Sequence, residues 1–177
     1  MSAVPSCRIR ACLPGDEQAL ALVGQATFLE AFAGLLRGSD ILEHCAHKHT
    51  AQVYRAWLQD EGVECWLVEA EAGAAAVGYL VLTPAELPLS DLDATDLEVR
   101  RVYLLHRFQG VGLGRQLMDL ARERAMRRGA RRLLLGVFSQ NHAAIAFYRA
   151  LGYVAVGTRS FQVGAMLCED LLLALKL

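Results

Sequence analysis

The segment "RFQGVGLGRQLM" at residues 107–118 places three glycines on alternate positions directly before a run with helical spacing. It follows "DLEVRRVYLL" at residues 96–105, which has the composition of a strand. A glycine-rich turn from a strand into a helix leaves several backbone N–H groups unpaired beside the positive end of the helix dipole. Such a turn is typical of a phosphate site, and an ordinary flexible turn is the alternative interpretation.

Two common phosphate motifs do not fit this segment. A P-loop has Lys followed by Ser or Thr after its last glycine, whereas Arg115 and Gln116 follow Gly114 here. The dinucleotide fingerprint needs a third glycine or alanine at a fixed spacing after Gly110 or Gly112, and none stands there. The segment therefore indicates another phosphate-bearing ligand.

Outward from this turn, short strand-like segments alternate with longer helix-like ones, which indicates an α/β fold. The continuous run Leu133, Leu134 and Leu135 predicts a central strand that is covered on both faces. Thr50 is expected to cap a helix inside the segment 40–61. Strands are expected at residues 7–12, in a hairpin at 64–83 around Gly73, and at 96–105, 131–138, 153–161 and 168–177; helices are expected at 14–32, 40–61, 112–128 and 141–151.

Composition narrows the function classes. The chain has 177 residues, a hydrophobic fraction of 54% and a formal net charge of −1, which suits one compact domain over residues 1–177. A charge near zero disfavours nucleic acid as a partner, and the absence of an apolar run of about 18 residues disfavours a membrane span. The first 18 residues lack the pattern of a secretory signal, so we expect a cytoplasmic protein.

Five cysteines without a C-x-x-C pair argue against both a disulfide framework and a zinc ribbon, and we interpret them as buried small hydrophobic residues: Cys7, Cys12, Cys45, Cys65 and Cys168. In "HCAHKH", His44 and His47 could share a helix face and bind a metal, but no second ligand pair is visible. A solvated helix or a lining of the substrate site is the favoured interpretation, and no metal is expected.

Two motifs together resemble the GCN5-related N-acetyltransferase (GNAT) family. "QGVGLG" fits its Q/R-x-x-G-x-G/A signature at Gln109, Gly112 and Gly114, and "SQNHAAIAFYRALGYVAVG" resembles its second hallmark, an asparagine followed by an aromatic–tyrosine pair and a "LGY" turn. The strand "LEVRRVYLL" also resembles the family, and the likeness covers nearly the whole chain. The stretches "FLEAF", "LEVRRVY" and "GTRSFQVG" resemble a polyamine-acetylating branch.

The resemblance implies a mixed sheet of six to seven strands, splayed at a cleft for acetyl-CoA and flanked by helices. The pantetheine arm would pair with the backbone of Val102, Tyr103 and Leu104, and Asn141 would reach the amide portion of the cofactor. The pyrophosphate would lie on the amides of a loop comprising Gly110, Val111, Gly112, Leu113, Gly114 and Arg115, and the Arg115 guanidinium could add a contact. The implied partner is a small-molecule or peptide amine, and a homodimer is allowed.

The same resemblance implies two catalytic residues. An amine with a pKa near 10.4 is almost entirely protonated at pH 7, so a base must take its proton before it attacks the thioester. Glu98 matches the family's carboxylate, acting directly or through water, and an ion-paired glutamate beside Arg100 and Arg101 is the alternative. Tyr148 would lie near the sulfur and protonate the departing thiolate, and a core tyrosine is the alternative.

Some positions depart from the family pattern or remain open. His106 stands at a position that is commonly proline, and Ala165 stands where the polyamine-acetylating branch often has an acid. Candidate partners of the amine are Glu43, Asp91, Asp93 and Asp96. An arginine cluster could attract phosphates, although a solvated helix face is favoured for it: Arg122, Arg124, Arg127, Arg128, Arg131 and Arg132. A non-catalytic CoA-binding module and an unrelated phosphate-ligand enzyme remain the alternatives to an acetyltransferase.

Overall fold

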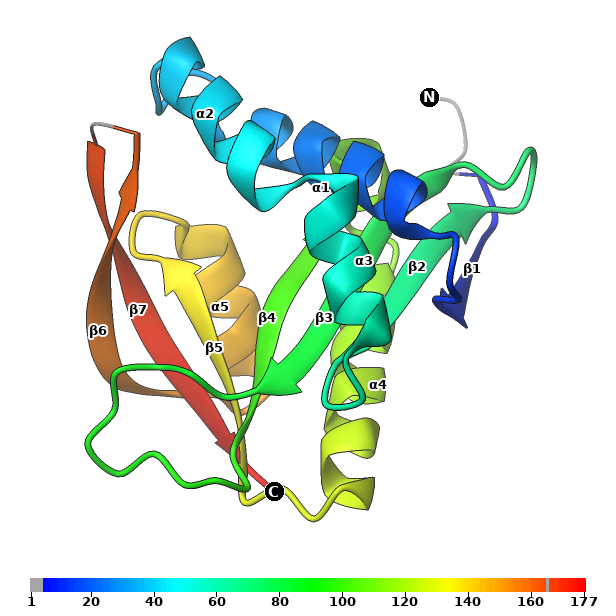
Figure 1. The fold of residues 1–177 in the computed structure, drawn as a ribbon. Helices are drawn as coiled ribbons and strands as arrows, with labels where there is room; N and C mark the ends of the chain where they lie inside the picture. The colour runs from blue at the N-terminus through cyan, green and yellow to red at the C-terminus, as the bar shows by residue number, and fades with distance from the viewer. Residues whose placement is uncertain (1–4, 165) are drawn as a thin grey trace.

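The computed structural model describes residues 5–164 and 166–177, so Ala165 lies outside the described residues. The described residues form one seven-stranded sheet with the order β1-β2-β3-β4-β5-β7-β6 (Figure 1). The strands are β1 Cys7–Ala11, β2 Glu64–Ala70, β3 Ala76–Pro84, β4 Leu97–Leu104, β5 Arg132–Phe138, β6 Val154–Val163 and β7 Met166–Lys176. The helices are α1 Glu17–Phe32, α2 Gly38–Lys48, α3 Ala51–Gln59, the short 3-10 helix η1 His106–Phe108, α4 Leu113–Arg127 and α5 His142–Ala150.

The element order expected from the sequence is therefore confirmed, and so is the mixed sheet between helices. Thr50 divides the expected helical segment 40–61 into α2 and α3. Its hydroxyl accepts a hydrogen bond from the Val53 amide at 3.2 Å and so caps α3. The hairpin turn contains Gly73 at a φ of +81°, a conformation that favours glycine. The structure differs at the C-terminal end, where β6 and β7 form a longer hairpin than the sequence pattern predicted.

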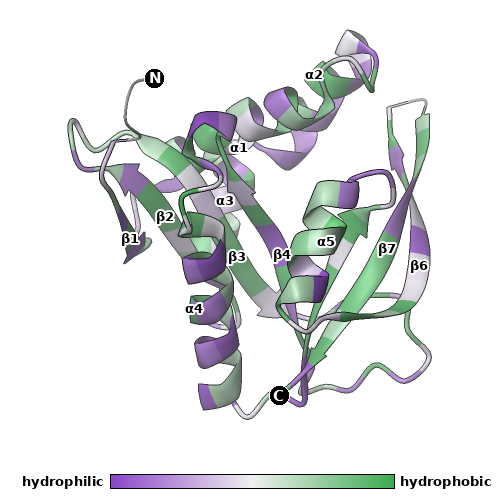
Figure 2. Cartoon of the chain, turned by 180° about the vertical axis from the view of Figure 1, so that it is seen from behind, coloured by the Kyte–Doolittle hydropathy of each residue, from purple (hydrophilic) through white to green (hydrophobic). Residues whose placement is uncertain are grey.

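Helices cover both faces of the sheet. Helices α1 to α3 lie on one face, and α4 and α5 lie on the other (Figures 1 and 2). Helix α4 carries hydrophilic residues on the side turned to the viewer in Figure 2, and Leu117 and Ala121 of this helix are fully buried. Leu133, Leu134 and Leu135 are at most 2% exposed, which confirms the central strand expected from their run.

The sheet opens between β4 and β5. These parallel strands pair only at Leu97 with Leu133 and at Glu98 with Leu134, whereas β5 pairs with β7 along its whole length. Beyond Glu98, the β5-facing edge of β4 has no strand partner among the described residues. The splay of the sheet expected from the family resemblance is thus present at this place.

Candidate functional site

The glycine loop has the backbone conformation that an anion site needs. Gly110 and Gly112 have φ values of +76° and +89°, and a Cβ on either would meet no atom within 4 Å, so the loop surface is bare backbone. Gly112 caps α4 without a side-chain hydrogen bond. The first recorded backbone bond of this turn runs from the Gln116 amide to the Gly112 carbonyl, which leaves the amides of residues 110–115 without a partner among the described residues. These amides can donate to a phosphate.

Gln109 holds the loop against the end of β4. Its side-chain Nε2 donates to the Leu104 carbonyl at 2.9 Å. One of the backbone acceptors expected for the pantetheine arm is therefore engaged within the protein. The Leu105 amide donates to the Val77 carbonyl, so the alternation of an antiparallel pair turns the backbone groups of Tyr103 towards β3 and those of Val102 towards the free edge. The expectation that Tyr103 offers its backbone to the arm does not fit this register. Gln109 therefore has a structural role in this chain, because it ties the loop to β4. Its position in the motif did not indicate this role.

Three elements meet at Gly114. A Cβ there would lie 3.6 Å from the Phe147 ring of α5 and 3.8 Å from a methyl group of Leu104 in β4. The start of α4, the open edge of β4 and helix α5 thus surround the same space. The Arg115 side chain is 68% exposed and lies 3.7 Å from Asp119, so it can turn towards an anion on the loop.

Asn141 begins α5. Its Oδ1 accepts the Ala144 amide at 3.1 Å, and so the oxygen serves as the helix cap. Only the side-chain NH₂ group is left to donate to a ligand. The exposed Asn141 therefore keeps half of the hydrogen-bonding capacity that the resemblance implied.

Tyr148 packs between two aromatic rings and keeps its hydroxyl free. Its ring lies 5.2 Å from the Phe147 ring and 5.9 Å from the Tyr153 ring, and the residue is 9% exposed. The buried side-chain atoms without a hydrogen-bond partner among the described residues are Arg100 Nε and the Tyr153 hydroxyl. The Tyr148 hydroxyl also has no recorded partner, so it must remain open to solvent. Burial raises its pKa, and the neighbouring Tyr103 adds to the rise, so this phenol stays protonated.

Glu98 lies deeper than the sequence suggested. It is 1% exposed, its Oε2 accepts the Glu86 amide at 3.2 Å, and its Oε1 lies 3.3 Å from Arg100 Nε. Burial raises the pKa of Glu98, and the positive charge of Arg100 opposes that rise. Glu98 is thus a buried, ion-paired carboxyl with a raised pKa, and its role as a base stays a prediction.

Side chains of β4 alternate between the two faces of the sheet. Leu97 and Val99 join the core beneath α4, whereas Glu98 and Tyr103 belong to the opposite face, and an irregularity beside Arg100 keeps Arg101 on that face as well. The residues expected to bind the cofactor therefore lie around the splay. Glu98 lies at the end where β4 and β5 still pair.

Sequence reasoning missed the charged pair Arg159 and Asp170 on the same face, where Asp170 is only 5% exposed. The one available signal was an acidic residue at the start of the apolar strand run "DLLLAL". Their pairing depends on the register of β6 against β7, which a single sequence does not specify.

The acidic residues proposed as amine partners are mostly engaged elsewhere. The Asp96 side chain has no exposed surface and receives hydrogen bonds from Arg131 and Arg132, and Asp91 also accepts from Arg132. Asp93 accepts from the Thr95 hydroxyl and amide. The expectation that these three bind the amine does not fit the structure, because their charges are used to hold the loop before β4.

The same contacts explain the arginine cluster. Arg124 and Arg128 pair with Glu64, and Arg127 pairs with Glu123. Together with the two arginines on Asp96, these side chains form ion pairs on the outside of α4 and after it. The favoured interpretation as a solvated helix face is therefore supported over a phosphate site.

His44 and His49 of the histidine-rich segment face inward, whereas His47 is exposed. The His44 ring stacks on Phe28 at 4.1 Å, and His49 is 2% exposed with its Nδ1 2.9 Å from the Tyr54 hydroxyl. Burial and the nearby Arg101 charge lower the pKa of His44 to about 4 and that of His49 to about 2, so both rings are neutral. The described residues contain no group of three or more His, Cys, Asp or Glu side chains that could hold a metal ion. His44 lines an aromatic wall with Phe28.

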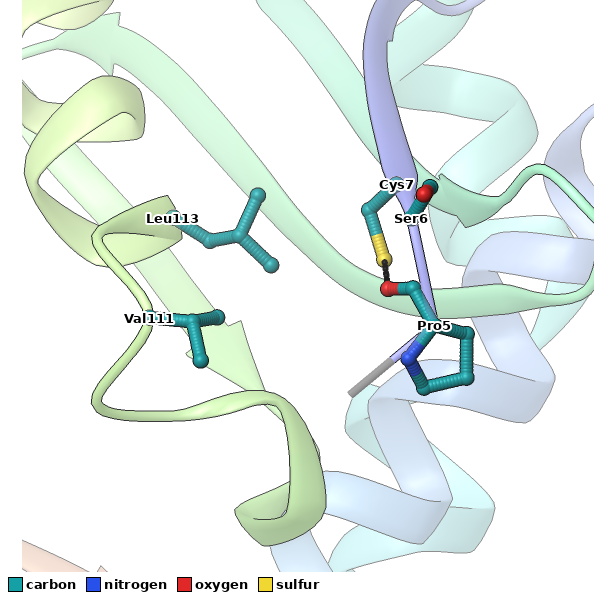
Figure 3. Close-up of a pocket in the computed structure, with 5 residues that line it drawn as sticks. All are labelled: Pro5, Ser6, Cys7, Val111 and Leu113. Atoms are coloured by element: carbon teal, nitrogen blue, oxygen red, sulfur yellow. Dashed lines mark hydrogen bonds between the residues drawn. The ribbon is translucent and has the colours of Figure 1, made fainter. Parts of the chain in front are cut away.

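A pocket of about 350 Å³ opens beside the glycine loop (Figure 3). Val111 and Leu113 approach it from the loop, and Pro5, Ser6 and Cys7 line it from the start of β1. The Cys7 Sγ donates to the Pro5 carbonyl at 3.4 Å, so the thiol points towards the local backbone. This pocket is next to the free amides and can receive part of a ligand bound on them.

Comparisons with known proteins agree with this geometry. Residues 30–153 match the acetyltransferase (GNAT) family. An uncharacterized N-acetyltransferase of Lactobacillus delbrueckii subsp. lactis is 34% identical over 96 residues, which cover 54% of this chain and 56% of the relative. An uncharacterized N-acetyltransferase of Mycobacterium tuberculosis is 36% identical over 89 residues, covering 50% and 53% of the two chains. The chain spans about half the length of these curated relatives.

Solved structures share the whole fold. The PaiA N-acetyltransferase of Thermoplasma acidophilum, solved with coenzyme A, superposes with a TM-score of 0.78 at 18% identity over 97% of this chain and 99% of that one. A Salmonella typhimurium protein solved with its cofactor acetyl-CoA gives a TM-score of 0.67 at 21% identity, covering 97% and 94% of the two chains. At these identities the likeness shows that the fold is common to all three.

Proposed function

Because the chain belongs to the acetyltransferase (GNAT) family, we propose that it transfers the acetyl group of acetyl-CoA to a primary amine of a small molecule or a peptide. One observation carries the proposal. The unpaired amides of residues 110–115 lie at the start of α4, next to the edge of β4 that has lost its partner β5. A phosphate-bearing donor with an extended arm fits both features, because its phosphates can accept from the amides while its arm pairs with the strand.

In this proposal acetyl-CoA supplies an activated acetyl group, and the residues of the chain hold it and move protons. Val102 presents backbone groups to the arm, and the glycine loop with Arg115 binds the pyrophosphate. The NH₂ group of Asn141 reaches the arm from the side of α5. Leu104 contributes to the binding site through its side chain, which lies beside Gly114.

Two residues handle the protons. Glu98 takes the proton of the acceptor amine, and its depth beneath the loop at residues 85–96 favours transfer through water. Tyr148 donates its proton to the departing thiolate, which its open hydroxyl and raised pKa support. No covalent bond to the enzyme is required, so the cysteines have no catalytic part.

Release of free thiol from acetyl-CoA tests this function. The assay would use separate panels of polyamines, aminoglycosides, amino acids and peptides with a free N-terminus. Turnover with any amine supports the transferase, and the stretches resembling the polyamine-acetylating branch are the reason to include polyamines. Binding of CoA in calorimetry without thiol release for any acceptor would favour the non-catalytic module instead.

Substitution of Glu98 separates its two roles. We expect Glu98→Gln to lower kcat most at neutral pH and to recover part of the loss as the pH rises, because solvent then deprotonates more of the amine. Equal activity of the variant and the parent protein at pH 7 would reduce Glu98 to a structural residue.

Two further parts of the proposal concern the cellular compartment and the oligomeric state of the protein. All five cysteines are free, which supports a reducing compartment such as the cytoplasm. The described part of the chain has no helix with the length and apolarity to cross a membrane. Leu22, Leu29 and Leu42 are exposed on α1 and α2 and support a homodimer, which sedimentation would detect.

A further inference from the structure

The Arg159 and Asp170 side chains lie together over β5 at Gly136. Arg159 Nε and Nη2 contact Asp170 Oδ2 at 3.0 and 2.9 Å. A Cβ at Gly136 would come within 3.0 Å of both Arg159 Nη2 and Asp170 Oδ2. The bare backbone of Gly136 is therefore what lets this charged pair lie across the strand.

The position of Gly136 sets the pair at the splay of the sheet. Gly136 is two residues beyond Leu134, the last residue of β5 that pairs with β4. Leu134 and Leu172 share a cluster with Leu87 on the face that carries Glu98, and Leu172 is the partner of Gly136 in β7. Asp170, two residues before Leu172, lies on the same face. The pair thus stands where the two halves of the sheet separate, on the side away from α4.

Electrostatic coupling agrees with this placement. Burial raises the pKa of Tyr103 on the opposite side of the splay, the positive charge of Arg101 opposes that rise, and the negative charge of Asp170 adds to it. Tyr103 in turn contributes to the raised pKa of Tyr148. Asp170 is therefore close enough to Tyr103 for its charge to act across the splay.

Asp170 keeps one oxygen open. Both contacts from Arg159 are to Oδ2, and Oδ1 has no recorded partner among the described residues. Oδ1 is not one of the two buried unpaired atoms, so it must be open to solvent in the splay. Burial raises the pKa of Asp170, and Arg159 opposes the rise and favours the ionised form. The site therefore offers a fixed carboxylate oxygen without a donor.

We propose that Asp170 binds the ammonium group of the acceptor amine through Oδ1, and that Arg159 is a positioning residue that fixes the carboxylate through Oδ2. The proposal rests on the acetyltransferase function and extends it to the recognition of the acceptor. A carboxylate shared between a guanidinium and an ammonium group accepts charge-assisted hydrogen bonds from both. Glu98 cannot take this part as readily, because it is 1% exposed and paired with Arg100.

The two carboxylates then have separate and measurable roles. Asp170 holds the nitrogen, so its loss acts on amine binding, whereas Glu98 receives the proton, so its loss acts on turnover. Asp170→Asn and Glu98→Gln are matched changes, since each replaces a buried carboxylate by an amide of the same shape. We expect Asp170→Asn to raise the KM of the amine by roughly 10- to 150-fold with kcat within about threefold, as for a lost hydrogen bond to a charged group. Glu98→Gln should show the reverse split.

A second variant tests position without removing any charge. Gly136→Ala should push the pair aside and raise the KM of the amine in the same direction as Asp170→Asn. The double variant Arg159→Gln/Asp170→Asn removes both charges and lets two amides pair, which protects folding. In all of these variants the affinity for CoA should stay within about twofold of the parent by calorimetry.

The outcomes distinguish the two proposals. An unchanged KM of the amine in folded Asp170→Asn or in the double variant would overturn the role of Asp170 while leaving the acetyltransferase intact. Calorimetric titration of the amine into the CoA complex makes the same comparison without turnover. Amine binding that depends on Asp170, with no thiol release by the parent protein, would refute the transferase and retain the amine site.

Discussion

Replacing Tyr148 by Phe isolates one hydroxyl at the centre of the proposed mechanism. The Phe ring fills the same space beside Phe147 and Tyr153, and the lost hydroxyl has no recorded hydrogen-bond partner among the described residues. We therefore expect the free energy of unfolding to change by no more than about 0.5 kcal/mol. The affinity for CoA should also survive, because the loop amides and the edge of β4 are untouched.

Activity should respond very differently. If the hydroxyl protonates the thiolate as the thioester breaks, kcat and kcat/KM should fall together by about 10²- to 10⁴-fold, the range of a general acid. The pKa of Tyr148 is raised above its ordinary value by burial, so the parent protein should lose activity only at a pH above about 10, and this high-pH limb should vanish in the variant. Thiol release under single-turnover conditions measures the chemical step directly.

Tyr153→Phe is the matched control for this experiment. Tyr153 is also buried and its hydroxyl is also unpartnered among the described residues, but it lines a separate pocket together with Met118, Leu151 and Leu175. We expect this variant to keep full activity. A Tyr148→Phe protein with kcat within about twofold of the parent, where chemistry limits the rate, would show that Tyr148 only packs.

Three further results are expected. Gly114→Asp should weaken CoA binding more than about tenfold in calorimetry by placing a like charge at the phosphates, whereas Gly114→Ala should bind well because its Cβ meets neighbours at 3.6 and 3.8 Å; equal affinities would remove the loop from the site. The folded pKa of His49 is about 2, below the unfolded value near 6.5, so stability is full above pH 6.5 and falls as the pH drops. Denaturant titrations should show this fall, and His49→Gln should make it shallower by up to about 1.4 kcal/mol per pH unit; identical slopes would contradict the assignment. Asp96→Asn should lower the free energy of unfolding by about 1.5–3 kcal/mol without changing the KM of the amine, since it weakens the charge-assisted hydrogen bonds from Arg131 and Arg132, and a raised KM would return Asp96 to the acceptor site.

The sequence was informative where chemistry depends on neighbours along the chain. The glycine-rich turn before α4 and the cap at Thr50 follow from local residue types, and both lie where the pattern predicted them; the turn has positive φ values at Gly110 and Gly112. The short run of leucines in β5 likewise required burial on both faces wherever the strand was placed.

Contacts between distant segments could not be read in the same way. The partners of Asp96 are 35 and 36 residues away along the sequence. No local pattern predicts that two arginines form ion pairs with this carboxylate, which the sequence alone makes a candidate partner of an amine. The depth of Glu98 depends on a loop that folds back over it, through the Glu86 amide. Asp170 reaches the splay only because a glycine of another strand leaves room for it.

The opening between β4 and β5 also bears on cooperativity. Backbone hydrogen bonding joins the half-sheet β1–β4 to the half-sheet β5–β7 at only two residue pairs, so the side-chain cluster beneath α4 and α5 carries most of the connection. A donor arm bonded along β4 fills the place of a missing strand and adds links between the halves. Ligand at about 100 times its Kd then adds about 2.7 kcal/mol to the free energy of unfolding. We expect amide exchange along this inner edge of β4 to slow in the presence of ligand, because the two halves then unfold as one unit.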